Sequence, residues 1–145
     1  MFRSVLIVIG ILVSSCKSTK QSSSEPAIYA AAPTPMSCIV DGRIVEILKP
    51  VDTDMNSVCS KHPCMAKVLI EDIHTCGSSV SLPVNPGDTM EMHFTYTLSD
   101  TRKIFPDMKA HYPGLKKGKK FTATVEQRLA PGTDGHFVVT HYTVK

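Results

Sequence analysis

Apolar and polar residues alternate over several stretches between residues 38 and 145. The clearest stretch is 89–99, TMEMHFTYTLS, in which apolar side chains occupy every second position from Met90 to Leu98. This alternation predicts a half-buried strand, because successive side chains of a strand point to opposite faces. Similar β-rich stretches predict further strands, and the five expected strands lie at about 38–48, 66–76, 89–99, 120–129 and 136–144.

The stretches between the predicted strands are rich in turn-forming residues. Two prolines and two glycines interrupt 100–119, which excludes a long regular helix there. Gly42 lies inside the first predicted strand, where a glycine often marks a bulge or a sharp bend. The pattern therefore predicts an all-β domain whose first strand is bent.

The predicted strands resemble an OB-fold, a small five-stranded Greek-key barrel. The resemblance rests on topology: a bent first strand, and the longest connection between the third and fourth strands, in a domain of about 108 residues. An immunoglobulin-like β-sandwich is the alternative, but such a domain has about seven strands.

The N-terminus has the pattern of an export signal. Arg3 precedes the apolar run Val5–Val13. About nine apolar residues match the core of a signal peptide, whereas a bilayer span needs about twenty. The string Val13-Ser14-Ser15-Cys16 then resembles the lipobox of bacterial lipoproteins. An ordinary secretory signal followed by an incidental cysteine is the alternative.

The lipoprotein resemblance implies cleavage before Cys16 and attachment of diacylglycerol to its thiol, usually with a further acyl group such as palmitate on the amine. Two or three acyl chains anchor a protein stably, at about 0.8 kcal/mol per buried CH₂. In Gram-negative lipoproteins an Asp at the next position commonly signals inner-membrane retention. Lys17 stands there, so the resemblance implies the bacterial outer membrane.

Residues 16–37 are rich in Ser, Ala, Pro and Lys and show no periodicity, which predicts a flexible tether. About twenty flexible residues reach about 25 Å on average. The expected organisation is a signal peptide at 1–15, the lipidated cysteine and tether at 16–37, and a β-barrel domain at 38–145.

Cysteine number and spacing predict two disulfides. Four cysteines remain once Cys16 carries lipid, and an even number is typical of oxidised, exported chains. If the first two strands form an antiparallel hairpin with Leu48 opposite Ala66, then Cys38 and Cys76 face each other. The expected disulfides are Cys38–Cys76 across this hairpin and Cys59–Cys64 within its loop.

The same loop is the best metal candidate, because Cys59, His62 and Cys64 offer ligands that suit Cu(I) or Zn. His93 and nearby methionines add soft donors. Periplasmic copper and silver chaperones, which use an OB-like barrel with Met and His ligands, are the nearest functional analogy. Those proteins also use a Trp, which this chain lacks. The simpler interpretation is that a disulfide closes the loop and that the methionines belong to the core, so no cofactor is expected.

The segment 102–120 is the best candidate binding surface, because it combines many cations with interleaved aromatic residues. Its candidate residues are Arg102, Lys103, Lys109, Tyr112, Lys116, Lys117, Lys119 and Lys120. On an OB-like barrel, cations hold phosphate and aromatic rings stack on the ligand. The outer membrane offers little nucleic acid, so anionic lipid head groups or lipopolysaccharide phosphates are nearer partners. A solvated basic loop is the alternative.

Composition and motifs narrow the function class. A hydrophobic content of 42% excludes wholesale disorder, and a net charge of +3 does not indicate a nucleic-acid binder. The sequence has no Gly-x-Ser-x-Gly elbow, no His-Glu-x-x-His motif and no phosphate-binding glycine loop. We expect a non-catalytic binding or assembly module, tethered to the membrane, for another envelope protein, a glycan or a lipid head group. A soft-metal chaperone or sensor is the alternative.

Overall fold

The computed structural model describes residues 32–49, 54–129 and 136–145. Nearly all of its regular structure is β-strand, at positions close to those that the alternation predicts. The strands are β1 (Ser37–Ile47), β2 (Met65–Cys76), β3 (Thr89–Phe94), β4 (Lys120–Arg128) and β5 (His136–Val144). The described helices are a single α-helical turn, α1 (Val58–Lys61), and a 3₁₀ turn at Thr101–Lys103.

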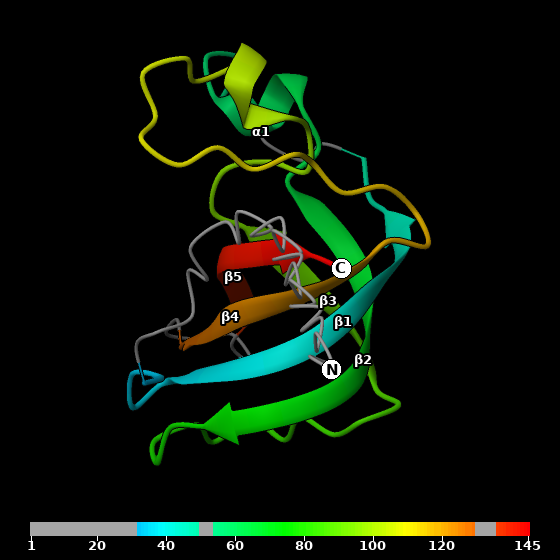
Figure 1. The fold of residues 1–145 in the computed structure, drawn as a ribbon, viewed down its shortest axis with the longest axis vertical. Coiled ribbons are helices and arrows are strands. Elements are labelled where there is room, and N and C mark those ends of the chain that lie inside the picture. The colour runs from blue at the N-terminus through cyan, green and yellow to red at the C-terminus, as the bar shows by residue number, and fades with distance from the viewer. Residues whose placement is uncertain (1–31, 50–53, 130–135) are drawn as a thin grey trace, which may run out of the picture.

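The five strands close into a barrel in the order β1-β2-β3-β5-β4. Adjacent strands are antiparallel, except that β3 and β5 run parallel. In Figure 1 the barrel lies below, and the connections that contain α1 and residues 95–119 lie together above it. This closed barrel confirms the OB-like prediction. The sandwich alternative is wrong, because a sandwich packs two separate sheets face to face.

The barrel interior is filled by the inward-facing residues of each strand. Three rings lie at its centre: Phe94, Phe121 and Tyr142, whose centroids are 6.1–6.2 Å apart. Their tilted and edge-on contacts are the arrangement that aromatic quadrupoles favour. Met92 is also fully buried in this core, which confirms the core interpretation of that methionine.

The β1–β2 ladder is irregular at Gly42, where the sequence predicts a bulge or a bend. The β1–β2 register shifts between Asp41 and Gly42, and a Cβ at Gly42 would lie 2.8 Å from Val68 and 3.1 Å from Phe121. Only a residue without a side chain lets these two core groups approach the backbone so closely.

The β1–β2 hairpin carries the first expected disulfide. Cys38 lies opposite Cys76, with Cα atoms 4.0 Å apart, and the two form a disulfide. At the other end of the hairpin, Ile47 rather than Leu48 lies opposite Ala66. Register shifts along the hairpin account for this one-residue difference from the predicted pairing, because β2 has two residues without a partner, His74 and Glu71, and β1 has one, Val45.

β3 ends at Phe94, five residues before the predicted end at 99. Its neighbour β2 begins only at Met65, which lies opposite His93, so β3 has no further residue of β2 to pair with beyond that point. The chain turns away instead, and the Leu98 amide donates to the Pro63 carbonyl at 2.8 Å. Alternation predicts which side chains are buried, whereas ladder length depends on the neighbouring strand.

The folded region begins slightly before the predicted start at 38. Ser37 is the first residue of β1, and the carbonyls of Pro35 and Met36 accept hydrogen bonds from Ser79 and Gln127. The last residues of the predicted tether are therefore attached to the barrel.

The connection between β3 and β4 contains no long helix, as its prolines and glycines predict. No helix in the described part of the chain is both long and apolar enough to cross a membrane.

We expect Gly42→Ala to destabilise the barrel by about 1–3 kcal/mol, because the added methyl group forces Val68 or Phe121 to move. Urea unfolding followed by circular dichroism measures this change. Lys117→Ala is the surface control and should change stability by less than about 0.5 kcal/mol. Equal stabilities for the wild type and Gly42→Ala would contradict the close packing at this bend.

Candidate functional site

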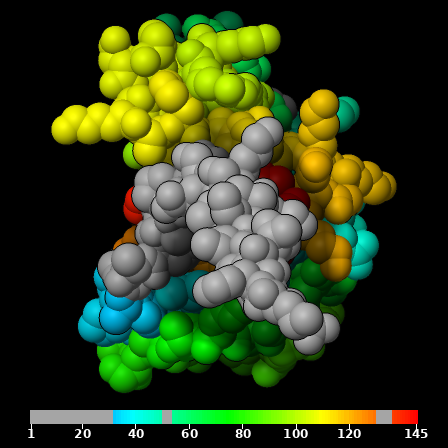
Figure 2. All heavy atoms as spheres, viewed as in Figure 1, coloured from blue at the N-terminus to red at the C-terminus, as the bar shows by residue number. Residues whose placement is uncertain are grey.

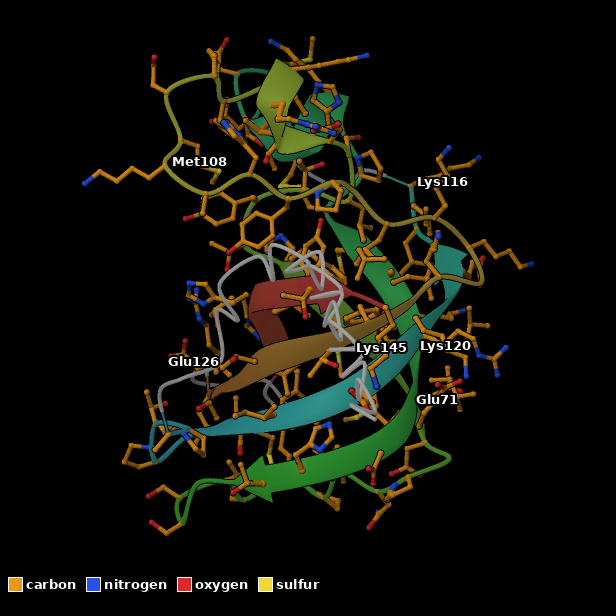
Figure 3. The ribbon with its side chains drawn as sticks, in the orientation of Figure 1. Glu71, Met108, Lys116, Lys120, Glu126 and Lys145 are labelled. Atoms are coloured by element: carbon orange, nitrogen blue, oxygen red, sulfur yellow. A yellow bond between two sulfur atoms is a disulfide. The ribbon has the colours of Figure 1, made fainter. Side chains whose placement is uncertain are left out.

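The fold divides the basic segment 102–120 into two parts. In Figure 2 residues around 100–110 (yellow) and residues around 116–120 (orange) project from opposite sides of the molecule. Figure 3 likewise places Met108 and Lys116 far apart. The segment therefore does not form one continuous basic surface.

Two cations of this segment are held in ion pairs. The Arg102 guanidinium contacts the Asp100 carboxylate at 2.7–3.1 Å, and this pair holds the pKa of Asp100 at about 2. The Lys120 ammonium lies 2.9 Å from Glu71. Lys103, Lys109, Lys116, Lys117 and Lys119 are exposed, with no carboxylate partner among the residues described.

The prediction that Tyr112 belongs to a binding surface is wrong. Its side chain is only 4% exposed and is part of the core. The ring packs against Tyr142 at 4.7 Å and against Tyr96 at 5.6 Å. The Thr101 amide donates to the Tyr112 carbonyl at 3.0 Å, which draws this part of the connection over the barrel end.

A groove of about 650 Å³ lies where the β3–β4 connection covers one end of the barrel. Strand ends and the two connections above the barrel all contribute to its walls. Its main apolar lining residues are Ile47, Leu98, Leu115 and Val144, and its charged residues are Asp100, Lys116 and Lys119. Two lysines of the basic segment therefore border an apolar groove.

Backbone hydrogen bonds fix the groove and the lysine turn. The Leu115 amide donates to the Leu98 carbonyl at 2.8 Å, next to Gly114, whose φ of +83° suits glycine. The turn 116–119 is tied to β1, because Ile44 exchanges backbone hydrogen bonds of 2.7 and 3.0 Å with Gly118 and Lys119. The lysine backbones are thus held in place, while the ammonium groups stay exposed.

A polar network lies on the outer face of β1, β2 and β4. Asp41 is 8% exposed, and its carboxylate accepts hydrogen bonds from Lys145 at 2.6 Å, Thr122 at 2.6 Å and His74 at 3.1 Å. Burial raises the pKa of this carboxyl, but the hydrogen bonds from these three groups outweigh burial and lower the pKa of Asp41 to about 2.

Asp41, Asp72 and His74 could in principle supply three metal-ligand atoms within 4.8 Å of one another. Both carboxylate oxygens of Asp41 already accept hydrogen bonds, one of them from the Lys145 ammonium. We therefore interpret this cluster as a structural network. Figure 3 places Lys145 near the Lys120–Glu71 pair.

The second expected disulfide, Cys59–Cys64, closes the loop that contains α1, with Cα atoms 5.4 Å apart. Cys64 is the last residue before β2 and is 2% exposed. The Cys59 sulfur lies 3.9 Å from Nε2 of His93 in β3. Cys59, Cys64 and His93 bring three donor atoms within 4.8 Å of one another, and the ring of His62 is not part of this cluster.

A second cavity has a volume of about 590 Å³ and shares His93 with this cluster. His93 lies in its wall with Met65, its cross-strand partner on β2. Met90 and His136 also line it. The β2–β3 register sets Met65 opposite His93. Sequence reasoning missed His136, because the β3–β5 pairing brings it to this cavity from a distant position.

Comparison with protein-family models, curated proteins and solved structures finds no match to this chain. Cys16 and the predicted export signal lie outside the described residues.

We expect Asp41→Asn to lower stability at neutral pH by about 1–2 kcal/mol, a value that allows for the partial exposure of Lys145 and His74. The folded pKa of about 2 lies below the ordinary value of 3.8, so ionised Asp41 stabilises the fold above that value. This contribution is lost as the pH falls through about 2, and the difference between wild type and variant should shrink accordingly.

Urea unfolding between pH 7 and pH 2 checks this expectation. Asp72→Asn is the matched control, because Asp72 is exposed and should contribute less than about 0.5 kcal/mol. A difference between wild type and Asp41→Asn that stays constant down to the lowest pH would contradict it.

Proposed function

We propose that this chain is an outer-membrane lipoprotein whose barrel is a non-catalytic module that binds anionic head groups at the envelope surface. Lipid attachment rests on the lipobox-like string that ends at Cys16. Head-group binding rests on one observation, the apolar groove bordered by Lys116 and Lys119. The module works without a cofactor or a nucleic-acid partner.

The groove favours a ligand that is both apolar and anionic. A volume of about 650 Å³ is within the range of small-ligand sites, and its strand-end walls can contact acyl or other apolar groups. The ammonium groups of Lys116 and Lys119 can then contact a phosphate or carboxylate at the rim. Lys117 adds a third exposed cation to the same turn.

Tethering makes this interaction effective at low intrinsic affinity. The predicted tether of about twenty residues has an expected mean reach of about 25 Å, so it would hold the barrel close to the head groups. Each lysine close to an anionic bilayer contributes about 1 kcal/mol. Besides the lipid anchor, the barrel thereby provides a second attachment to the membrane, and this second attachment weakens as the salt concentration rises.

Another envelope protein or a glycan remains the competing partner class. A neutral glycan carries no negative charge that could pair with the lysines of the turn 116–119. An envelope protein would have to present acidic groups there. The anionic head group needs no further assumption, since the proposed anchor already places the barrel at a membrane.

We expect the barrel, produced from Lys17 onward without lipid, to bind vesicles that contain anionic phospholipid and not zwitterionic vesicles. Lys116→Glu with Lys119→Glu should weaken vesicle binding roughly thirtyfold or more, from about 1 kcal/mol for each lysine. Co-sedimentation at low salt measures it. The matched control is Lys103→Glu with Lys109→Glu, which makes the same charge change on the opposite side.

If both double variants weaken vesicle binding equally, the binding depends on the net charge of the protein and not on the groove. A protein partner would replace the lipid if two results are found together. The wild type would bind no vesicles, and it would retain an envelope protein that Lys116→Glu with Lys119→Glu does not retain.

We expect Cys16→Ser to abolish incorporation of labelled palmitate and to prevent maturation of the chain. Mass spectrometry of the native product should find Cys16 as the first residue, with acyl groups attached. Cys59→Ser with Cys64→Ser is the control and should leave the label in place. An unmodified Cys16 sulfur, or an intact start methionine, would contradict the proposed anchor.

A further inference from the structure

We propose that Cys59, Cys64 and His93 form a soft-metal site for Zn²⁺ or Cu⁺ that the Cys59–Cys64 disulfide closes and reduction by a dithiol opens. This site is separate from the lysine-bordered groove and does not depend on head-group binding. It differs from the set that the sequence suggests, because His93 takes the place of His62.

The distances between the donor atoms fit a tetrahedral metal. Zinc at about 2.3 Å from sulfur and about 2.0 Å from nitrogen places two such ligands about 3.6 Å apart. The Cys59 sulfur and Nε2 of His93 are already 3.9 Å apart, and all three donors lie within 4.8 Å of one another. The largest change needed is in the bonded sulfur atoms, which must separate to about 3.8 Å.

The local structure permits this separation. Cys59 and Cys64 are five residues apart, and the loop that they close precedes β2. The barrel strands carry their own disulfide, Cys38–Cys76, so opening the small ring leaves the hairpin cross-link intact. His93 lies on β3 and needs no rearrangement of the sheet.

The neighbouring cavity supplies access and a fourth donor. His93 and Met65 both line it, so a metal ion can reach the imidazole from solvent. Met65 follows Cys64 directly and pairs with His93 across the strands. We assign its thioether as the fourth donor of the proposed set, which is rich in sulfur and suits Cu⁺ and Zn²⁺ rather than Mg²⁺ and Ca²⁺.

The opening step is thiol–disulfide exchange. A dithiol donor gives two electrons and two protons to the Cys59–Cys64 bond and itself becomes a disulfide. The metal then displaces the two thiol protons and binds two thiolates and the neutral imidazole. Oxidation by a disulfide reverses the process and releases the ion, so metal occupancy follows the thiol redox state around the protein.

Co²⁺ serves as the spectroscopic probe of the full chain, with a phosphine reductant that adds no competing thiol. We expect the reduced protein to bind one Co²⁺ with a thiolate-to-cobalt charge-transfer band, and the oxidised protein to give no such band. Zn²⁺ should displace the cobalt. His93→Ala should weaken binding at least about tenfold, whereas His62→Ala should leave it unchanged.

Two further variants keep the test decisive. Cys59→Ser with Cys64→Ser retains the Cys38–Cys76 pair and should lose the band, which excludes the other thiols as ligands. His93→Cys supplies a third thiolate and should restore binding with a stronger band. The proposal is overturned if reduction produces no band, if the double serine variant keeps it, or if His62→Ala and His93→Ala behave alike while both remain folded by circular dichroism.

Discussion

Closure of the barrel depends on the bend of β1, because this one strand pairs with β2 on one side and β4 on the other. A strand that serves two neighbours in a small barrel must coil strongly, and bulges and glycine kinks provide such coiling. Gly42 lies at this point, with Val68 and Phe121 against its backbone. One of the three register shifts of the β1–β2 hairpin lies at this point, and the Cys38–Cys76 disulfide lies at the end of the same hairpin.

Both proposed sites lie where a connection meets this closed barrel. The lysine-bordered groove forms where residues 98–101 and 112–115 cross one end of it, held by backbone hydrogen bonds to each other, while Gly118 and Lys119 bond to Ile44 of β1. The sulfur–imidazole cluster forms where the loop that contains α1 contacts β3. In each case the rigid barrel orients one half of the site and a connection supplies the other, which is how small barrels commonly carry function.

Ion pairs, and not the clustering of cations along the sequence, decide which charged side chains are available at the surface. Arg102 and Lys120 belong to the most basic segment of the chain, yet each is held by a carboxylate, Asp100 and Glu71. The buried Asp41 collects three donors from separate parts of the chain. The exposed lysines without an ion pair among the described residues fall into two separate groups, and the turn around Lys116 is the one that borders the groove.

Period-two alternation, the turn residues and the even cysteine number sufficed to predict five strands and both disulfides, because each depends on neighbouring residues or on one hairpin register. The prediction of an OB-like barrel rests on a resemblance in strand number and connection lengths. Tertiary structure alone decided where β3 ends, that Tyr112 is buried against Tyr142, and that His93 rather than His62 lies beside Cys59. These outcomes depend on which distant strands become neighbours around the closed barrel. A pattern along the chain does not carry that information, since closure is a property of all five strands together.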